Sequence, residues 1–271
     1  MRFLDNVMED FIKRAPDTME SARYSAMRER SVGLGVMGFH SFLQKKRIPF
    51  ESVMAKVWNK RIFSQIKEEA DKASILLANE KGACPDAKEY GVNERFSNKI
   101  AIAPTASISI ICGGASPGIE PIAANSFTQK TLSGSFNVRN PHLKSLLAEK
   151  GKDNEEVWSS ITINKGSVQH LEFLEDSEKA VFKTAFELDQ RRIIELAGDR
   201  TPYVCQAQSL YIFLKPDVNK RDLHMIHFSA WKRGVKSLYY LRSLSIQRAE
   251  VVSHNKKTTE VPIKGLSLIH I

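Results

Sequence analysis

Apolar residues recur at helical spacing in several stretches of the chain. The first stretch predicts a helix over Leu4–Arg14. A second helix is expected after Ser52, whose hydroxyl can accept hydrogen bonds from free backbone N–H groups. We expect this helix to end near Gly82, because glycine can adopt the left-handed conformation of a helix cap. Its predicted apolar face consists of Trp58, Ile62, Ile66, Ala70, Ala73 and Leu77.

Two further amphipathic helices are expected in the second half of the chain. One covers Glu178–Ala197 and is followed by Gly198. The other follows Asn219, which can cap it, with Asp222 three residues later. The stripe of the first is Phe182, Phe186, Ile193 and Ala197, and that of the second is Leu223, Ile226, Ala230 and Gly234.

Short apolar runs between these helices are typical of buried strands. They lie at Ile100–Ala103, Ser209–Phe213 and Ser237–Leu241. Because short strands alternate with longer helices, we expect an α/β layered or barrel architecture with the strands inside. The pattern is lost after about Gln247, and we expect a mobile polar tail there.

Composition narrows the class of protein without changing this interpretation. The chain has 271 residues, of which 42% are hydrophobic and 26% charged. These values are ordinary for a globular protein and exclude collagen-like and wholly disordered chains. No apolar run approaches the length of about 20 residues that spans a bilayer, and Met1–Asp5 does not resemble a signal peptide. We therefore expect a soluble, cytoplasmic protein without a membrane partner.

Charge and cysteine content give two weaker indications. The formal net charge of +9 favours an anionic partner such as nucleotide phosphates, nucleic acid or an acidic protein. The three cysteines, Cys84, Cys112 and Cys205, are too far apart for a Cys-x-x-Cys pair and indicate a reducing compartment. We expect Cys84 in a surface loop and the other two thiols buried.

Gly33–Gly38 has the spacing Gly-x-Gly-x-x-Gly of a dinucleotide-binding turn. That turn must follow a buried strand, yet the polar residues Arg28–Ser31 precede it. We therefore reject a dinucleotide site. The favoured interpretation is that the glycines allow close packing of a helix that contains Phe39, Phe42 and Leu43.

The segment after Ile100–Ala103 has the pattern of an anion-binding loop. Pro104 ends the predicted strand, and closely spaced hydroxyls follow at Thr105, Ser107 and Ser109. If a helix begins there, its free N–H groups and these hydroxyls can hold phosphate oxygens. From these residues alone, an ordinary capped helix explains the pattern better, because Ser and Thr are common caps.

Several motifs in the same order closely resemble the large subunit of class I ribonucleotide reductase. They are Arg30–Phe39, Pro104–Ser107, Gly118–Pro121, Leu132–Gly134, Asn140–Leu143, Gln206–Ser209, Trp231–Gly234 and Tyr239–Arg242. The resemblance covers roughly residues 1–248. It implies an α/β fold, the C-terminal half of a ten-stranded α/β barrel like those of glycyl-radical enzymes, in an enzyme that reduces ribonucleoside diphosphates for DNA synthesis.

The resemblance also gives roles to two sets of residues. Pro104, Thr105, Ala106, Ser107, Ile108 and Ser109 match the loop that binds the substrate diphosphate. Some relatives have threonine in place of Ile108, so one hydroxyl contact is missing here. Tyr239 and Tyr240 match the tyrosine pair that transfers the radical. Without the resemblance, packing between strands would be the preferred explanation of two adjacent tyrosines.

Other parts of the family pattern do not occur in this sequence. The reaction of the family begins at a cysteine in an Asn-x-Cys-x-Glu pattern, which is missing, as are the paired cysteines that take electrons from thioredoxin or glutaredoxin. We expect the chain itself to bind no cofactor. The family uses a metal-radical cofactor in its small, radical-generating subunit, and the effectors ATP and dNTPs bind at sites outside this segment.

These observations leave the organisation of the enzyme open. We assign residues 1–248 to the catalytic barrel and residues 249–271 to a flexible or non-native tail. The chain is either a fragment or the product of a split gene, and in both cases activity requires a complementary N-terminal half and the small subunit. The alternative function is a non-catalytic module that binds nucleotides or polyanions through its basic surface.

Overall fold

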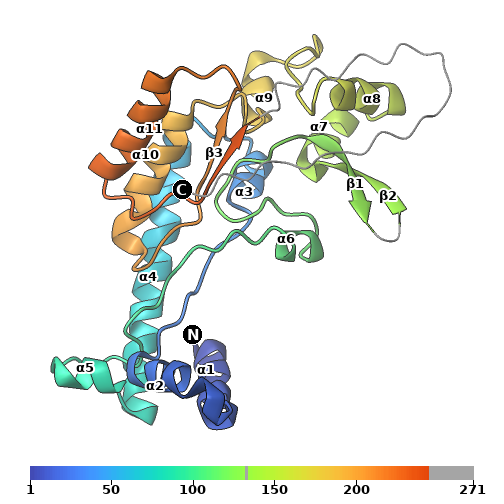
Figure 1. Cartoon of the computed structure of the whole chain (residues 1–271). Coiled ribbons are helices and arrows are strands. Elements are labelled where there is room, and N and C mark those ends of the chain that lie inside the picture. The colour runs from blue at the N-terminus through green and yellow to red at the C-terminus, as the bar shows by residue number, and fades with distance from the viewer. Residues whose placement is uncertain (132–133, 244–271) are drawn as a thin grey trace.

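The long helix predicted after Ser52 is the longest element of the fold. In the computed structural model it is α4 (Val53–Lys81), and the Ser52 hydroxyl accepts from the backbone N–H of Ala55 at 3.2 Å (Figure 1). The buried face of α4 is rotated around the helix relative to the predicted apolar face. Its buried residues are Ala55, Asn59, Phe63, Ala70, Ser74, Leu77 and Ala78. Trp58, Ile62 and Ile66 are partly buried at its edge. Gly82 has a φ of 90° but an extended ψ of 148°, so it does not form the expected left-handed cap.

The structure describes residues 1–131 and 134–243. The other helices are α1 (Arg2–Arg14), α2 (Glu20–Glu29), α3 (Phe39–Lys45), α5 (Pro85–Glu89), α6 (Ile108–Ile111), α7 (Pro141–Glu149), α8 (Glu155–Ile163), α9 (Asp176–Val181), α10 (Gln190–Arg200) and α11 (Lys220–Lys232), with single 3-10 turns at Asp17–Met19 and Thr201–Tyr203. The helix predicted after Asn219 is confirmed as α11, since the Asn219 side chain accepts from the N–H of Arg221. Leu132, Ser133 and the proposed tail 249–271 lie outside the described residues.

Four extended segments run parallel and side by side in the middle of the molecule. β3 (Tyr211–Leu214) pairs with β4 (Tyr240–Ser243). Single bridges join Ile102 to Gln208 and Leu34 to Ile100. The strands predicted at Ser209–Phe213 and Ser237–Leu241 are therefore present but begin later, while Ile100–Ala103 forms bridges without a full strand.

A second, antiparallel sheet lies apart from this row of parallel segments. It consists of β1 (Ser126–Thr131) and β2 (Gly134–Arg139). The two strands form a hairpin that the hydrophobic pattern did not predict. Figure 1 shows it on the side of the molecule that carries α6, α7 and α8.

The helix predicted over Glu178–Ala197 is wrong, because the structure has two helices there. α9 ends at Val181 and α10 begins at Gln190. Between them, the N–H and hydroxyl of Thr184 both donate to the Glu187 carboxylate, and Asp189 caps α10 by accepting from the N–H of Arg191. Such local side-chain bonds offer the backbone an alternative to the helix.

The main core lies where α4, α10 and α11 cover the parallel segments. It includes Phe63, Ile102, Ile193, Ile212 and Ile226. A smaller core, around Leu143, Trp158 and Phe182, joins α7, α8 and α9. Strand β3 is buried along its whole length, so it lies within this core.

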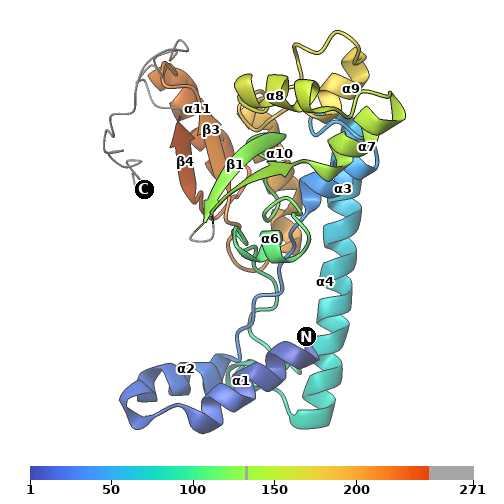
Figure 2. The same cartoon turned by 90° about the vertical axis from the view of Figure 1, so that its right-hand side faces the viewer.

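The N-terminal helices lie beside the C-terminal end of α4 (Figure 2), and a buried carboxylate joins them to it. Asp5 on α1 is fully buried and forms ion pairs with Arg30, Lys81 and Arg95 at 2.8–2.9 Å. Burial alone would raise the pKa of Asp5, but the hydrogen bonds from these three cations lower it to about 2. The carboxylate therefore stays charged and stabilises the junction.

The cysteine positions are the reverse of the expectation. Cys84 is buried, because it precedes α5 in a segment that folds back so that its N–H donates to the carbonyl of Glu94. Cys112 and Cys205 are exposed. The Cys205 sulfur nevertheless accepts from the N–H groups of Lys99 and Ile100 at 3.0 Å.

Candidate functional site

The loop that begins at Pro104 is fixed by one unusual contact. Thr105 has a φ of +52°, a conformation that non-glycine residues rarely adopt. Its hydroxyl oxygen accepts from the N–H of Gly118 at 2.8 Å. Gly118 also has a positive φ, and a Cβ atom there would lie 3.1 Å from the carbonyl oxygen of Ala103. A side chain at residue 118 would therefore crowd the loop and strain the backbone, so glycine suits this close approach.

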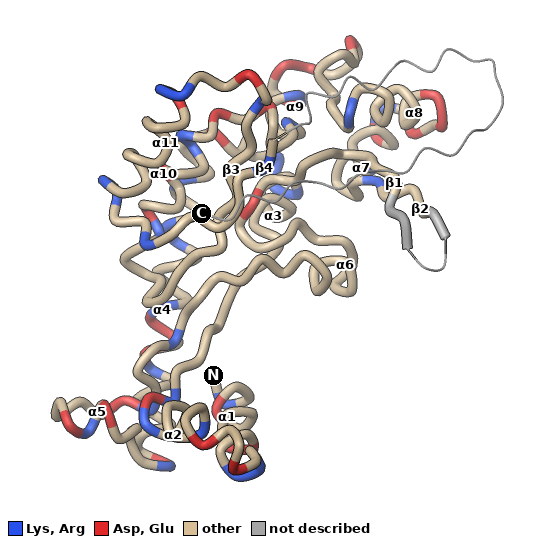
Figure 3. Tube along the Cα trace, in the orientation of Figure 1, with Lys and Arg blue, Asp and Glu red and all other residues tan. Residues whose placement is uncertain are grey.

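The hydroxyls of this loop have different environments. Ser109 is buried and donates to the carbonyl of Ala106 at 3.1 Å. Ser107 is exposed, and its side chain makes no capping bond to α6. The helix expected here is only the four residues of α6, Ile108–Ile111. Residues 100–119 contain no Lys, Arg, Asp or Glu (Figure 3), so an anion bound here must rely on hydroxyls, N–H groups and more distant cations.

The glycine motif Gly33–Gly38 packs against the segments on either side of the loop. The expected helix with Phe39, Phe42 and Leu43 is present as α3, but it begins after Gly38, so Gly33 and Gly35 pack against an extended segment instead of this helix. A Cβ atom on Gly35 would lie 2.7 Å from the carbonyl oxygen of Ala101. The N–H of Gly38 donates to the carbonyl of Ser116 at 2.7 Å. The glycines thus allow two extended segments to pack closely.

The tyrosine pair forms a direct ring contact. The ring centroids of Tyr239 and Tyr240 are 4.1 Å apart with planes inclined at 57°. Regular strand alternation would place neighbouring side chains on opposite faces. The contact is possible because β4 begins only at Tyr240, while Tyr239 precedes it and donates its N–H to the carbonyl of Leu210 at 2.9 Å. A hydrogen bond with Tyr240 raises the pKa of Tyr239.

A small cleft of about 60 Å³ connects the loop with the strands that carry the tyrosines. Its lining residues come from the loop, from the segment after Gly118 and from β3 and β4, namely Pro104, Ala106, Pro117, Glu120, Pro121, Ala123, Tyr211, Phe213 and Arg242. The structure therefore brings the predicted loop and the neighbourhood of the predicted pair together.

Three residues of this cleft were missed by sequence reasoning. Glu120 and Arg242 lie inside motifs that carried the resemblance but received no role, and Tyr211 was noted only as part of a strand. The Glu120 side chain is 4% exposed, and its Oε1 atom has no hydrogen-bond partner within the described part of the chain. Burial raises the pKa of Glu120 to about 8, although Arg242 acts in the opposite direction.

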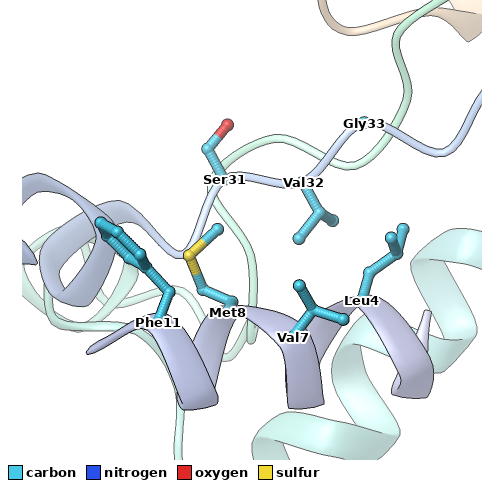
Figure 4. A pocket seen from close by; sticks show the side chains of 8 residues that line it. Leu4, Val7, Met8, Phe11, Ser31, Val32 and Gly33 are labelled. Atoms are coloured by element: carbon cyan, nitrogen blue, oxygen red, sulfur yellow. The ribbon is translucent and has the colours of Figure 1, made fainter. Parts of the chain in front are cut away.

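A larger depression lies far from this cleft, beside α1. It has a volume of about 450 Å³ and lies between the helix and residues Ser31–Gly33 (Figure 4). Its lining is almost entirely apolar, with Leu4, Val7, Met8, Phe11, Ala26 and Val32. Because it contains no titratable or nucleophilic group besides the Ser31 hydroxyl, it is a poor candidate for chemistry.

The described residues provide neither a metal-binding cluster nor a membrane-spanning helix. Among residues 1–131 and 134–243, no group of three or more His, Cys, Asp and Glu side chains is placed to hold a metal ion. In the same residues, no helix is both long and apolar enough to cross a membrane.

Comparison with known proteins identifies the family. The model of the ribonucleotide reductase barrel domain matches residues 1–94 and 85–241. The chain belongs to the ribonucleotide reductase barrel-domain family. This membership supports an α/β barrel-type fold, of which the described strands form an open part.

Relatives of this family resemble the chain over most of its length. The ribonucleoside-diphosphate reductase large subunit of Invertebrate iridescent virus 6 is 48% identical over 94% of this chain, and that of Invertebrate iridescent virus 3 is 44% identical over 95%. A class Id ribonucleotide reductase alpha subunit from Actinobacillus ureae has a TM-score of 0.82 and 42% identity over 90% of the chain. The chain spans only 27%, 41% and 45% of these three relatives, respectively.

Proposed function

We propose that this chain is part of the catalytic barrel of a ribonucleoside-diphosphate reductase large subunit, corresponding to the C-terminal half of a ten-stranded barrel. In this proposal, residues 1–248 belong to the barrel. The observation that carries the proposal is the cleft that Pro104 and Ala106 of the loop line together with residues of β3 and β4, next to the ring contact of Tyr239 and Tyr240. The named relatives with this barrel are reductase subunits.

The loop binds the diphosphate of the substrate. Ser107 supplies an exposed hydroxyl, and Ala106 and Ile108 supply backbone N–H groups, while Thr105 holds the loop to Gly118. Ser109 closes the loop, because its N–H donates to the carbonyl of Thr105 and its hydroxyl to that of Ala106. Pro104 ends the extended segment that positions the loop. The absence of charged residues from 100–119 favours a small diphosphate over a polyanion, which would need several cations at the site.

Tyr239 and Tyr240 relay the oxidising equivalent. A tyrosine that loses one electron and its O–H proton becomes a neutral radical, and the reverse step restores the phenol. The ring contact at 4.1 Å supports a direct exchange between the two residues. The cysteine that receives the oxidising equivalent from the pair is supplied by another part of the large subunit, since the sequence here contains no Asn-x-Cys-x-Glu pattern.

The proposed reaction requires partners beyond this chain. They are the complementary N-terminal half of the barrel, a small subunit that generates the radical from its own metal cofactor, and thioredoxin or glutaredoxin as the source of electrons. The effectors ATP and dNTPs bind outside this chain. The chain itself contributes the phosphate loop and the relay.

The relay is tested by Tyr240→Phe in the reductase assembled with the complementary N-terminal half and the small subunit. Phenylalanine preserves the ring but cannot lose an O–H proton, so we expect nucleotide reduction to be abolished while the substrate binds with nearly unchanged affinity. Turnover and equilibrium binding of a ribonucleoside diphosphate measure the two effects. Retained turnover would refute the relay.

The phosphate loop is tested by Ser107→Ala. Loss of a charge-assisted hydrogen bond should weaken diphosphate binding by about 1 kcal/mol or more. Isothermal titration with a ribonucleoside diphosphate measures the change. If the Ser107→Ala variant binds as tightly as the parent, the exposed hydroxyl makes no contact with the phosphates, and its part in the proposal is wrong.

A further inference from the structure

A third tyrosine ring lies against the relay pair. Tyr211 on β3 is opposite Tyr240 in the parallel register. Its ring centroid lies 5.2 Å from that of Tyr240 and 5.6 Å from that of Tyr239, with planes inclined at 37° and 89°. Since the pair itself is separated by 4.1 Å, the three rings form a mutually contacting cluster.

Tyr211 is held more firmly than either ring of the pair. It is 5% exposed, whereas Tyr239 is 42% exposed. The Cζ atom of Arg242 lies 4.5 Å from the Tyr211 ring centroid, within the range of a cation–π contact. Burial raises the pKa of the Tyr211 hydroxyl, while a hydrogen bond from Arg242 acts in the opposite direction. Strand β3 is buried throughout, so its backbone is also fixed.

The tyrosine pair needs a neighbouring ring to hold it, because Tyr239 lies before the start of β4. Tyr239 precedes β4, and one backbone hydrogen bond, to Leu210, is recorded for its N–H. Proton transfer between two groups requires hydrogen-bond distance, and a displacement of about 1 Å can cost a hundredfold in rate. A ring that contacts both tyrosines restricts exactly the motions that would separate them.

We propose that Tyr211 is a positioning residue that holds Tyr239 and Tyr240 in ring contact, with the Arg242 guanidinium over the Tyr211 ring. The inference rests on the proposed relay function of the pair. Tyr211 also lines the cleft that Pro104 and Ala106 of the loop line. It therefore sets the position of the relay relative to the substrate loop through a single rigid ring.

The test compares three variants of the reductase assembled with its small subunit. Tyr211→Leu removes the ring, and Tyr211→Phe retains the ring but removes the hydroxyl. Ile212→Ala is the matched control, because it creates a defect at a residue that is 1% exposed, next along the same strand and on the opposite face. Thermal melting shows whether each variant is folded, and kcat and KM are measured for a ribonucleoside diphosphate.

Positioning predicts a specific pattern of kinetic changes. Tyr211→Leu should lower kcat by about tenfold or more with little change in KM, and Tyr211→Phe should recover most of that loss. Ile212→Ala should lower the melting temperature without lowering kcat. If Tyr211→Leu and Ile212→Ala lower kcat equally, Tyr211 acts only through stability, and the inference is overturned.

Three other outcomes would refute the positioning role or the relay. If Tyr211→Phe is as inactive as Tyr211→Leu, the hydroxyl is required, and Tyr211 does more than position its neighbours, which contradicts the inference. Tyr240→Phe is measured in parallel to separate the two proposals. Loss of turnover in Tyr240→Phe with full activity in Tyr211→Leu refutes the positioning role alone, whereas retained turnover in Tyr240→Phe refutes the relay itself.

Discussion

At the scale of single residues, Glu120 is the most unusual group in the candidate site. A buried carboxyl group normally has hydrogen-bond partners, because an unpaired charge in a low-dielectric environment is costly. Glu120 has a nearby cation, Arg242, but its Oε1 atom lacks a partner within the described residues. The side chain is therefore expected to be mostly protonated near neutral pH.

This protonation has a consequence for stability that Glu120→Gln should reveal. The unfolded chain ionises this carboxyl near its ordinary pKa of 4.5, but the folded protein holds the proton up to about pH 8. Because the folded state binds more protons between these values, this residue makes the free energy of unfolding decrease as pH rises through that window. Gln cannot ionise, so the variant should gain stability relative to the parent as pH rises.

Urea unfolding at about pH 5 and about pH 8 measures this difference. Glu172→Gln provides the control, since it makes the same chemical change at an exposed position. A stability difference between Glu120→Gln and the parent that is equal at both pH values would contradict the raised pKa of Glu120.

At the scale of elements, the close packing of extended segments depends on glycine. The bridge between Leu34 and Ile100 brings the two backbones together, and Gly33 and Gly35 flank Leu34 on the same side of its segment. At Gly33 a Cβ atom would meet the Cβ of Ala101 at 3.1 Å, but at Gly35 it would meet the Ala101 carbonyl oxygen at 2.7 Å. Removing the Ala101 side chain can relieve the first contact. It cannot relieve the second, because that contact is with a backbone atom.

Gly35→Ala should therefore destabilise the protein by about 1–3 kcal/mol, the usual cost of overpacking. Denaturant unfolding measures the loss. Adding Ala101→Gly should restore stability to Gly33→Ala but not to Gly35→Ala, because the clash of the latter is with backbone. Equal rescue of both variants would show that the segments can move apart.

Element prediction from the sequence succeeded where a cap and an apolar stripe agree. Ser52 and Asn219 were expected as caps, and both accept the corresponding backbone hydrogen bonds. The single helix expected over Glu178–Ala197 was wrong because its apolar spacing continues through Thr184 and Asp189, whose side chains bind nearby backbone groups. Periodicity does not register this competition. The β1–β2 hairpin was missed because its strands are mostly polar and therefore show no apolar pattern.

At the scale of the whole molecule, local patterns cannot show which distant segments meet. Thr105 and Tyr240 were identified by motif resemblance, but Tyr211 meets Tyr240 and Arg242 only because β3 pairs with β4. Glu120 reaches the cleft through the segment after Gly118, whose N–H donates to Thr105. The net charge of +9 also did not locate the anion-binding site, since the candidate loop region, residues 100–119, contains no charged side chains. The N-terminal helices lie at the opposite end of α4 from the parallel segments (Figure 2), and stabilise the fold without lining the candidate site.

The arrangement of the three cysteines offers a natural reporter of this site. Cys112 directly follows α6 and has an exposed thiol, whereas Cys84 is enclosed and the Cys205 sulfur is engaged by backbone groups. A thiol-reactive fluorophore should therefore attach preferentially at Cys112, next to the candidate phosphate loop. The native sequence thus carries its own attachment point, and occupancy of the loop can be followed by fluorescence without introducing a cysteine.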